Sequence, residues 1–286
     1  MTRRVVLVGL VASAALAATV VAVAFPSRAS VLAGYAIANG GDTQWELPKE
    51  LSEVSGLATT PEGRVFAHGD ERALLIELDV RAQRVVKAFA MGRNGVPGDF
   101  EGIAVVEGRF WLMTSDGILY ESAEGENGGW VPFRTYDTGV GRQCEVEGLA
   151  HDPTSASLMI VCKEPRVPAL RDHVIVFKWS IARRALLPQG TLRLRSKALA
   201  QSAGVSSFHP SGIERDSATG HWLLVAARQR AIVEITPAGE LVGGVALVRR
   251  RHRQPEGIAI GSERSLLVAD EGGGRRGVLT VYRRAR

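Results

Sequence analysis

Only two of the 286 residues are cysteines, the first of several scarcities that narrow what this chain can be. The sequence contains no Cys-x-x-Cys pair and no cluster of cysteine with histidine, which excludes the common structural zinc motifs. The six histidines do not recur at one place in the sequence pattern, and none is evidently paired with a nucleophile as a general base. The sequence therefore identifies no catalytic residue.

Aromatic residues are also few, at 6% of the chain, and the basic residues do not form a stripe among them. The net charge of +5 comes from separate groups of arginines near the start, at residues 249–253 and at the end. A nucleic-acid-binding surface combines a continuous basic patch with stacking aromatics, so we do not expect nucleic acid as a partner. Hydrophobic residues make up 45% of the chain, which favours a buried core over disorder.

A long hydrophobic run occurs only at the start of the chain. Arg3 and Arg4 precede an uncharged apolar stretch at residues 5–25, in which Ala22-Val23-Ala24 has the small residues that a signal peptidase recognises. The stretch also matches the ~20 residues needed to span a bilayer. We therefore expect residues 1–30 to be a signal peptide or, if uncleaved, an N-terminal membrane anchor. Residues 31–286 are expected to lie in the cell envelope, in the periplasm or another extracytoplasmic space, anchored or secreted.

A tripeptide that recurs five times sets the organisation of this second part. Each copy has serine or glutamate, then glycine, then leucine or isoleucine, and the copies begin at Ser55, Glu101, Glu147, Ser211 and Glu256. The intervals between them are 46, 46, 64 and 45 residues. Each copy opens a series of short apolar segments bounded by turn formers, which is typical of antiparallel strands. We predict an all-β fold, a five-bladed β-propeller of four-stranded antiparallel blades behind an N-terminal hydrophobic helix, with six blades as the alternative.

The last repeat ends after its third strand, so a closed ring needs a fourth strand from elsewhere. We expect the segment before the first repeat, somewhere in residues 32–38, to supply it, because ring closure removes exposed sheet edges. The third interval is 64 residues rather than about 46. The extra residues fall between Trp179 and His209 and are expected to form a longer loop.

The two cysteines, Cys144 and Cys162, flank one predicted hairpin whose turn lies around residues 152–154. Cross-strand pairing about this turn places them nearly opposite each other, and an oxidising compartment permits a bridge. A disulfide and a pair of free thiols both remain open.

The repeat also predicts where acidic side chains gather. The innermost strand of each blade lines the central channel of a propeller, so the first residue of the tripeptide recurs around the axis. A second position recurs 15 to 17 residues later, at the end of the next strand and hence at the same mouth of the channel. Its residues are Asp70, Asp116, Glu164, Arg228 and Glu271, with Asp270 beside the last.

Carboxylates packed closely need a counter-charge, because each raises the pKa of the others. A Ca²⁺ ion could supply it, since it accepts ~6–8 oxygen ligands in flexible geometry. The alternative is that Arg228 and water neutralise the ring and no metal binds. The expected calcium ligands are the glutamates of the ring, Glu101, Glu147 and Glu256, ahead of any one of the outer acids at the channel mouth, Asp70, Asp116, Glu164 and Glu271.

The ordered set of motifs resembles the SdiA-regulated, YjiK-like β-propellers of bacteria. The resemblance covers roughly residues 45–285 and rests on segments such as Asp99-Phe100-Glu101-Gly102-Ile103, Val161-Cys162-Lys163-Glu164 and Gln254-Pro255-Glu256-Gly257-Ile258-Ala259. It implies a five-bladed propeller behind a membrane segment, with a calcium site. Carried over position by position, the resemblance implies Glu101, Glu147 and Glu256 as the first calcium ligands and Glu164 and Glu271 as the next. Arg228 and Ser211 depart from the acidic pattern in the fourth blade, so the implied site is lopsided.

Two function classes fit this pattern. One is a non-enzymatic cell-envelope module, in which calcium holds the blades together and a propeller face binds a small molecule or a protein. The other is a calcium-dependent hydrolase of lactones or phosphoesters, in which the metal polarises the substrate. We favour the module, because the short blade loops argue against a deep substrate pocket.

Overall fold

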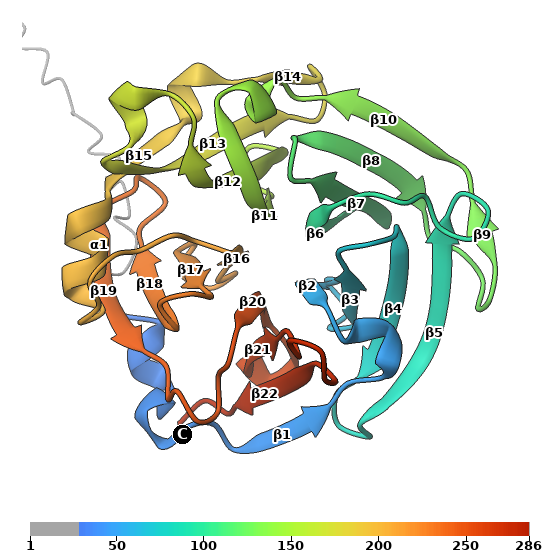
Figure 1. Cartoon of the computed structure of the whole chain (residues 1–286), viewed down its shortest axis with the longest axis horizontal. Coiled ribbons are helices and arrows are strands. Elements are labelled where there is room, and N and C mark those ends of the chain that lie inside the picture. The colour runs from blue at the N-terminus through green and yellow to red at the C-terminus, as the bar shows by residue number, and fades with distance from the viewer. Residues whose placement is uncertain (1–28, 286) are drawn as a thin grey trace, which may run out of the picture.

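The computed structural model describes residues 29–285, which form a five-bladed β-propeller (Figure 1). The blades follow one another along the chain around a central channel, and each is a sheet whose innermost strand faces the axis. The prediction of five blades is confirmed, and the alternative of six is wrong. The predicted N-terminal hydrophobic helix and the apolar stretch at residues 5–25 lie outside the described residues.

The strands of the first three blades run in order from the axis to the rim. Blade 1 contains β2 (Val54–Thr59), β3 (Val65–Gly69), β4 (Leu74–Asp79) and β5 (Arg84–Met91). Blade 2 contains β6 (Phe100–Val106), β7 (Arg109–Thr114), β8 (Ile118–Ala123) and β10 (Phe133–Asp137). Blade 3 contains β11 (Cys144–Asp152), β12 (Ser157–Pro165) and β13 (His173–Ser180), with β14 (Ala185–Leu186) and β15 (Leu192–Arg195) both paired to β13.

The last two blades follow the same order, and blade 5 combines three late strands with β1, the first strand of the propeller. Blade 4 contains β16 (Gly212–Arg215), β17 (Trp222–Ala226), β18 (Ala231–Ile235) and β19 (Leu241–Ala246). Blade 5 contains β20 (Pro255–Ile260), β21 (Leu266–Asp270), β22 (Val278–Tyr282) and, at its rim, β1 (Thr43–Glu46).

Helices are short and lie in the connections. The α-helix is α1 (Ser196–Ser202), and the 3-10 helices are η1 (Leu32–Gly34), η2 (Ile37–Asn39), η3 (Lys49–Leu51), η4 (Val140–Arg142), η5 (Pro168–Leu170), η6 (Pro188–Gly190) and η7 (Ser262–Arg264). Within residues 29–285, no helix has the length and hydropathy needed to cross a membrane.

The ring is closed by β1, which pairs antiparallel with β22 so that Thr43 faces Val281 and Glu46 faces Val278. The expected position of the closing strand, residues 32–38, is therefore wrong. Those residues form η1 and η2 instead, and Tyr35 makes a single bridge to Arg284. Their apolar side chains are buried in the core between blades 4 and 5. This packing, rather than pairing in a sheet, holds the segment in place.

Two other expectations need correction. The fourth strand that the repeat predicts for blade 2 is not one continuous run, because residues 130–136 are interrupted by Pro132, which cannot donate a ladder hydrogen bond. As a result β9 (Trp130–Val131) pairs in parallel with β5 of blade 1, while β10 completes blade 2. The extra residues in the third interval do not form only a loop, because they contain β14, β15 and α1.

The hydrophobic core is divided into five clusters, one between each pair of neighbouring blades. The glycine of the repeated tripeptide explains how these blades come so close at the axis. A Cβ on Gly102 would lie 2.7 Å from the backbone nitrogen of Leu149, and a Cβ on Gly212 would lie 2.6 Å from the carbonyl oxygen of Glu256. The tripeptide glycines have no positive φ, so space rather than backbone conformation requires glycine there.

This packing predicts that Gly102→Ala lowers the free energy of unfolding by about 2 kcal/mol, because the added methyl group meets the backbone of the neighbouring blade. Gly243→Ala in β19 is the matched control, since its Cβ would have no heavy atom within 4 Å. Urea unfolding of the two variants measures the difference. Equal stabilities would contradict the explanation of the repeat.

Candidate functional site

The first residue of the tripeptide lies on a β-bulge in four of the five blades. The register between the innermost strand and the next shifts around Ser55, Glu101, Glu147 and Glu256. A bulge leaves a residue without a cross-strand partner and re-aims its side chain. Ser55, Glu101 and Glu256 line a narrow cavity on the axis together with Ser211. The bulges thus account for the orientation of the glutamates towards the channel.

Glu101, Glu147 and Glu256 form a cluster in which the charge of one carboxyl group changes the pKa of another. Burial, followed by the charge of Glu147, raises the pKa of Glu101 well above its ordinary value. The same two causes raise the pKa of Glu256 to about 8. Burial also raises the pKa of Glu147, whose side chain is 4% exposed, although Lys163 opposes this. These three residues come from blades 2, 3 and 5, so the structure brings together the three glutamates that the repeat singled out.

The cluster contains one ammonium group, that of Lys163. Its Nζ contacts the carboxylate of Glu147 and lies 3.5 Å from Oε1 of Glu145. Ser55 Oγ donates a hydrogen bond of 2.8 Å to Glu101. Sequence reasoning gave Lys163 no role, although its place at the end of β12, beside Glu164, put it at the same mouth of the channel.

The acids of the second recurring position are less closely gathered. Glu164 is exposed and lies opposite Glu145 across the two strands, and Asp116 is exposed and accepts a hydrogen bond of 2.5 Å from Thr114. Burial raises the pKa of Glu271, and the charges of Asp70 and Glu53 add to this. Asp70 and Glu271 therefore form a second acidic group over blades 1 and 5, and the charge of Glu271 also raises the pKa of Glu256.

A cavity of about 420 Å³ opens at the channel mouth over blades 3, 4 and 5. Its walls combine the acidic cluster with several arginines. Glu147, Lys163, Glu164, His209, Ser211, Arg228, Arg230, Arg253, Gln254 and Glu256 are among its lining residues. We call this space the mouth cavity, and it gives two of the three inner glutamates access to a ligand.

The inner glutamates suit a hard cation in donor chemistry, because they supply three carboxyl groups, buried at Glu147 and half-buried at Glu101 and Glu256, with a single paired ammonium group. Among residues 29–285, no group of three or more His, Cys, Asp and Glu side chains has an arrangement that could hold a metal ion as they stand. A cation at the mouth would therefore require Glu147 to leave Lys163 and its side chain to rearrange.

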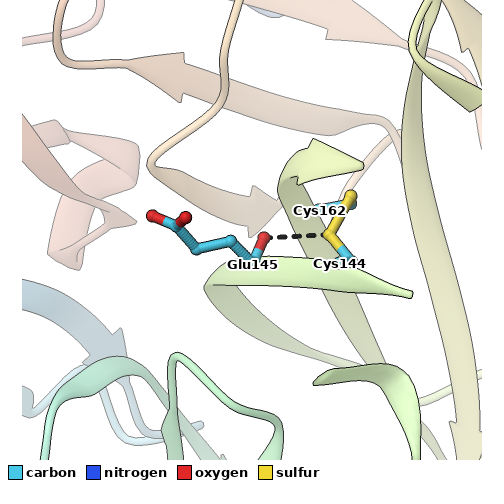
Figure 2. The surroundings of a disulfide bond; sticks show 3 residues. All are labelled: Cys144, Glu145 and Cys162. Carbon is cyan, nitrogen blue, oxygen red and sulfur yellow. Dashed lines mark hydrogen bonds between the residues drawn. A yellow bond between two sulfur atoms is a disulfide. The ribbon is translucent and has the colours of Figure 1, made fainter. Parts of the chain in front are cut away.

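A disulfide joins Cys144 and Cys162, whose Cα atoms lie 5.7 Å apart (Figure 2). It links the start of β11 to β12, the two strands that carry Glu147 and Lys163. The side chain of Glu145 extends away from the sulfur atoms, while its carbonyl oxygen lies 2.9 Å from Sγ of Cys144 (Figure 2). Both cysteines are buried between blades 2 and 3, so the disulfide anchors the strands of Glu147 and Lys163 in the hydrophobic core.

Comparison with known proteins agrees with this architecture. The glutaminyl cyclase of Myxococcus xanthus is similar in structure over 85% of this chain and 94% of its own, with a TM-score of 0.56 and 15% identity, which shows a shared fold. A virginiamycin B lyase of Staphylococcus aureus matches 82% of this chain and 69% of its own, at a TM-score of 0.43 and 11% identity, too little to carry an argument. A comparison with curated proteins gave no match. The SdiA-regulated family model matches residues 130–273, just over half of the chain, and the protein belongs to that family.

Proposed function

We propose that the protein is an exported binding module of the cell envelope whose channel mouth takes up Ca²⁺. The observation that carries the proposal is the cluster of three carboxyl groups, buried at Glu147 and half-buried at Glu101 and Glu256, whose pKa values are all raised. Burying several acidic groups together is costly, and a hard divalent cation offsets that cost. The arginines and the apolar stretch of residues 1–30 support export.

When bound, calcium would supply positive charge and oxygen coordination, and Glu101, Glu147 and Glu256 would hold it. Because these residues belong to blades 2, 3 and 5, the ion would tie together strands of three different sheets. Glu164 lies in the same cavity and is the next donor within reach of a rearranged site. Asp116 lines neither the mouth cavity nor the narrow cavity on the axis.

The proposal predicts a stability that depends on both pH and calcium. An acid whose pKa is raised by folding stabilises the native state below its ordinary pKa of about 4.3. That contribution is lost as the pH rises through the raised values, which is about 8 for Glu256. In a chelator, the melting temperature should therefore fall between about pH 5 and pH 9. Excess Ca²⁺ should restore it at pH 8 by several degrees and have little effect at pH 5, where protons compete.

Two variants sharpen this calcium test. Glu101→Gln should weaken calcium binding at least tenfold in calorimetric titration, and Lys163→Met should strengthen it roughly tenfold, because the ammonium group repels a cation at Glu147. Lys87→Met is the matched control, since Lys87 also contacts a carboxylate, that of Glu124, outside the channel. If Ca²⁺ produced neither heat nor a change in melting temperature in the native protein at pH 8, the proposal would be wrong. Calcium-dependent turnover of lactone or phosphoester chromogens, lost in Glu147→Gln, would favour the hydrolase instead.

A further inference from the structure

A second cavity, of about 480 Å³, adjoins the mouth cavity over blades 3 and 4. We call it the basic groove, and Lys163, Arg171, His173, Arg195, Lys197 and His209 line it. Lys163 and His209 line both cavities, so the two spaces adjoin each other. Together they extend from Glu147 and Glu256 towards α1.

Positive charge in the basic groove is largely uncompensated. Arg171, Arg195 and Lys197 make no ion pair with any residue of the described chain. Asp172, an exposed residue, is the acid among the lining residues. A concave surface lined by one sign of charge attracts ligands of the opposite sign.

One of the lining residues of the groove also has a buried polar atom without a hydrogen-bond partner. Nδ1 of His173 is buried and has no hydrogen-bond partner among the described residues. His173 lies directly opposite Arg195 in the pairing of β13 with β15, so the two side chains project from the same face of the sheet. Buried polar atoms are nearly always paired in folded proteins, so Nδ1 of His173 is polar capacity beside Arg195 that the described chain does not use.

The groove is also a product of the one irregular interval in the repeat. Arg195, Lys197 and His209 belong to the extra chain between the third and fourth tripeptides, where 64 residues replace about 46. This added segment contains β15 and α1, which form one wall. An insertion that builds a charged cavity on an otherwise regular scaffold is where a binding site is expected.

We propose that the basic groove binds a small polyanion carrying at least two phosphate or carboxylate groups. Arginine presents a planar fork of donors that matches either group in a bidentate manner. Each cavity lies within the range of about 300–1,000 Å³ that is typical of small-molecule sites. The inner glutamates at the far end limit the length of an anion, which favours a small molecule over a polymer. The inference goes beyond the calcium site and does not depend on it.

The test is calorimetric titration of the full chain with pyrophosphate and, separately, with citrate, in chelator and low salt. We expect saturable binding of at least one probe, and the stronger one shows whether phosphate or carboxylate is preferred. Arg171→Gln/Arg195→Gln should weaken it at least tenfold. Arg249→Gln/Arg250→Gln removes the same charge from exposed arginines outside both cavities and should change affinity less than twofold. No binding of either probe, or equal weakening in both variants, would overturn the proposal.

A second measurement on the unmutated protein keeps the test decisive if the double variant fails to fold. The bound probe should slow acetylation of Lys197, an exposed lining residue, at least threefold. Acetylation of Lys49 in η3, which is exposed and outside the groove, should be unaffected. Equal rates at Lys197 with and without the probe would count against binding in this groove. Because calcium is absent throughout, failure here leaves the calcium proposal standing.

Discussion

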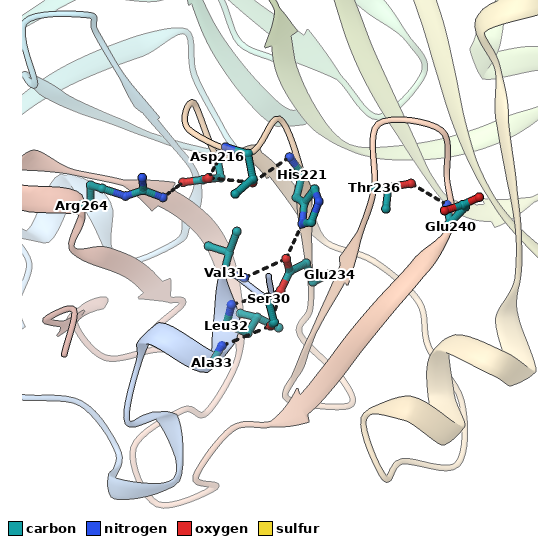
Figure 3. Close-up of polar contacts among 11 residues, drawn as sticks. Ser30, Val31, Leu32, Ala33, Asp216, His221, Glu234, Thr236, Glu240 and Arg264 are labelled. Atoms are coloured by element: carbon teal, nitrogen blue, oxygen red, sulfur yellow. Dashed lines mark hydrogen bonds and ion pairs between the residues drawn. The ribbon is translucent and has the colours of Figure 1, made fainter. Parts of the chain in front are cut away.

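Replacing Glu234 by alanine lowers the free energy of unfolding by about 3–5 kcal/mol, the cost of breaking a buried charged network. The Glu234 carboxylate is fully buried in β18 and accepts hydrogen bonds from the N-terminal segment on both oxygens (Figure 3). Ser30 Oγ and the backbone nitrogen of Leu32 donate to Oε2 at 2.7 and 3.1 Å. The backbone nitrogen of Val31 donates to Oε1 at 2.8 Å, and Nδ1 of His221 lies 2.5 Å from the same oxygen.

The large effect follows from what alanine leaves behind. Without the carboxylate, two backbone N–H groups and a fully buried histidine lose their acceptor, and each unsatisfied group costs about 1–3 kcal/mol. Urea unfolding measures the loss. Hydrogen exchange at Val31 and Leu32 provides a second readout, because the segment should detach from blade 4 before global unfolding.

The control for this prediction is Glu240→Ala, which removes an exposed glutamate that lies in the same blade (Figure 3). Its free energy of unfolding should stay within about 0.5 kcal/mol of the native protein. If Glu234→Ala cost no more than this control, the buried carboxylate would not be the group that holds the N-terminal segment in place.

Removing the disulfide, with Cys144→Ala/Cys162→Ala, is expected to lower the free energy of unfolding by about 3 kcal/mol. The bridge spans a sequence separation of 18 residues, and closing a loop of that size in the unfolded chain gives this magnitude in the chain-entropy model. Alanine is chosen because both sulfur atoms lie in an apolar core, where a hydroxyl group would add a separate cost. Chemical unfolding under non-reducing conditions measures the change.

The same double variant reports on the site. The bridge fixes β11 against β12, so its removal should loosen Glu147 relative to Lys163 and weaken calcium binding. Reduction of the native protein by dithiothreitol is the matched comparison and should reproduce the loss of stability without any mutation. A double variant as stable as the native protein, with reduction also harmless, would rule out a structural role for the bridge.

The sequence predicted the blades because their spacing is imposed by packing that repeats. Each inner strand must pass its neighbour with no room for a side chain, so glycine is needed once per blade and the tripeptide counts the blades. The same recurrence predicted that Glu101, Glu147 and Glu256 would meet, since equivalent positions of a closed ring share one axis.

Features that do not repeat were beyond the sequence. The bulges that orient the glutamates leave no mark in the residue pattern, so the contact between Lys163 and Glu147 could not be foreseen. The prediction of a strand at residues 32–38 is wrong because an apolar segment beside the repeat can be buried without joining a sheet. Its side chains pack between blades 4 and 5 instead. The basic groove combines residues distant in sequence and depends on α1, which the pattern did not indicate.

The pairing of β1 with β22 has a consequence for the order of folding. Because β1 pairs with β22, the ring cannot close until the chain has been synthesised as far as Tyr282. Bringing such distant residues together costs about 5 kcal/mol of loop entropy if nothing between them has formed. Blades 1 to 4 each draw their main strands from one stretch of chain and can form first, which shortens the effective loop. The propeller is therefore expected to assemble blade by blade. It becomes kinetically stable only in a late step, when β1 pairs with β22.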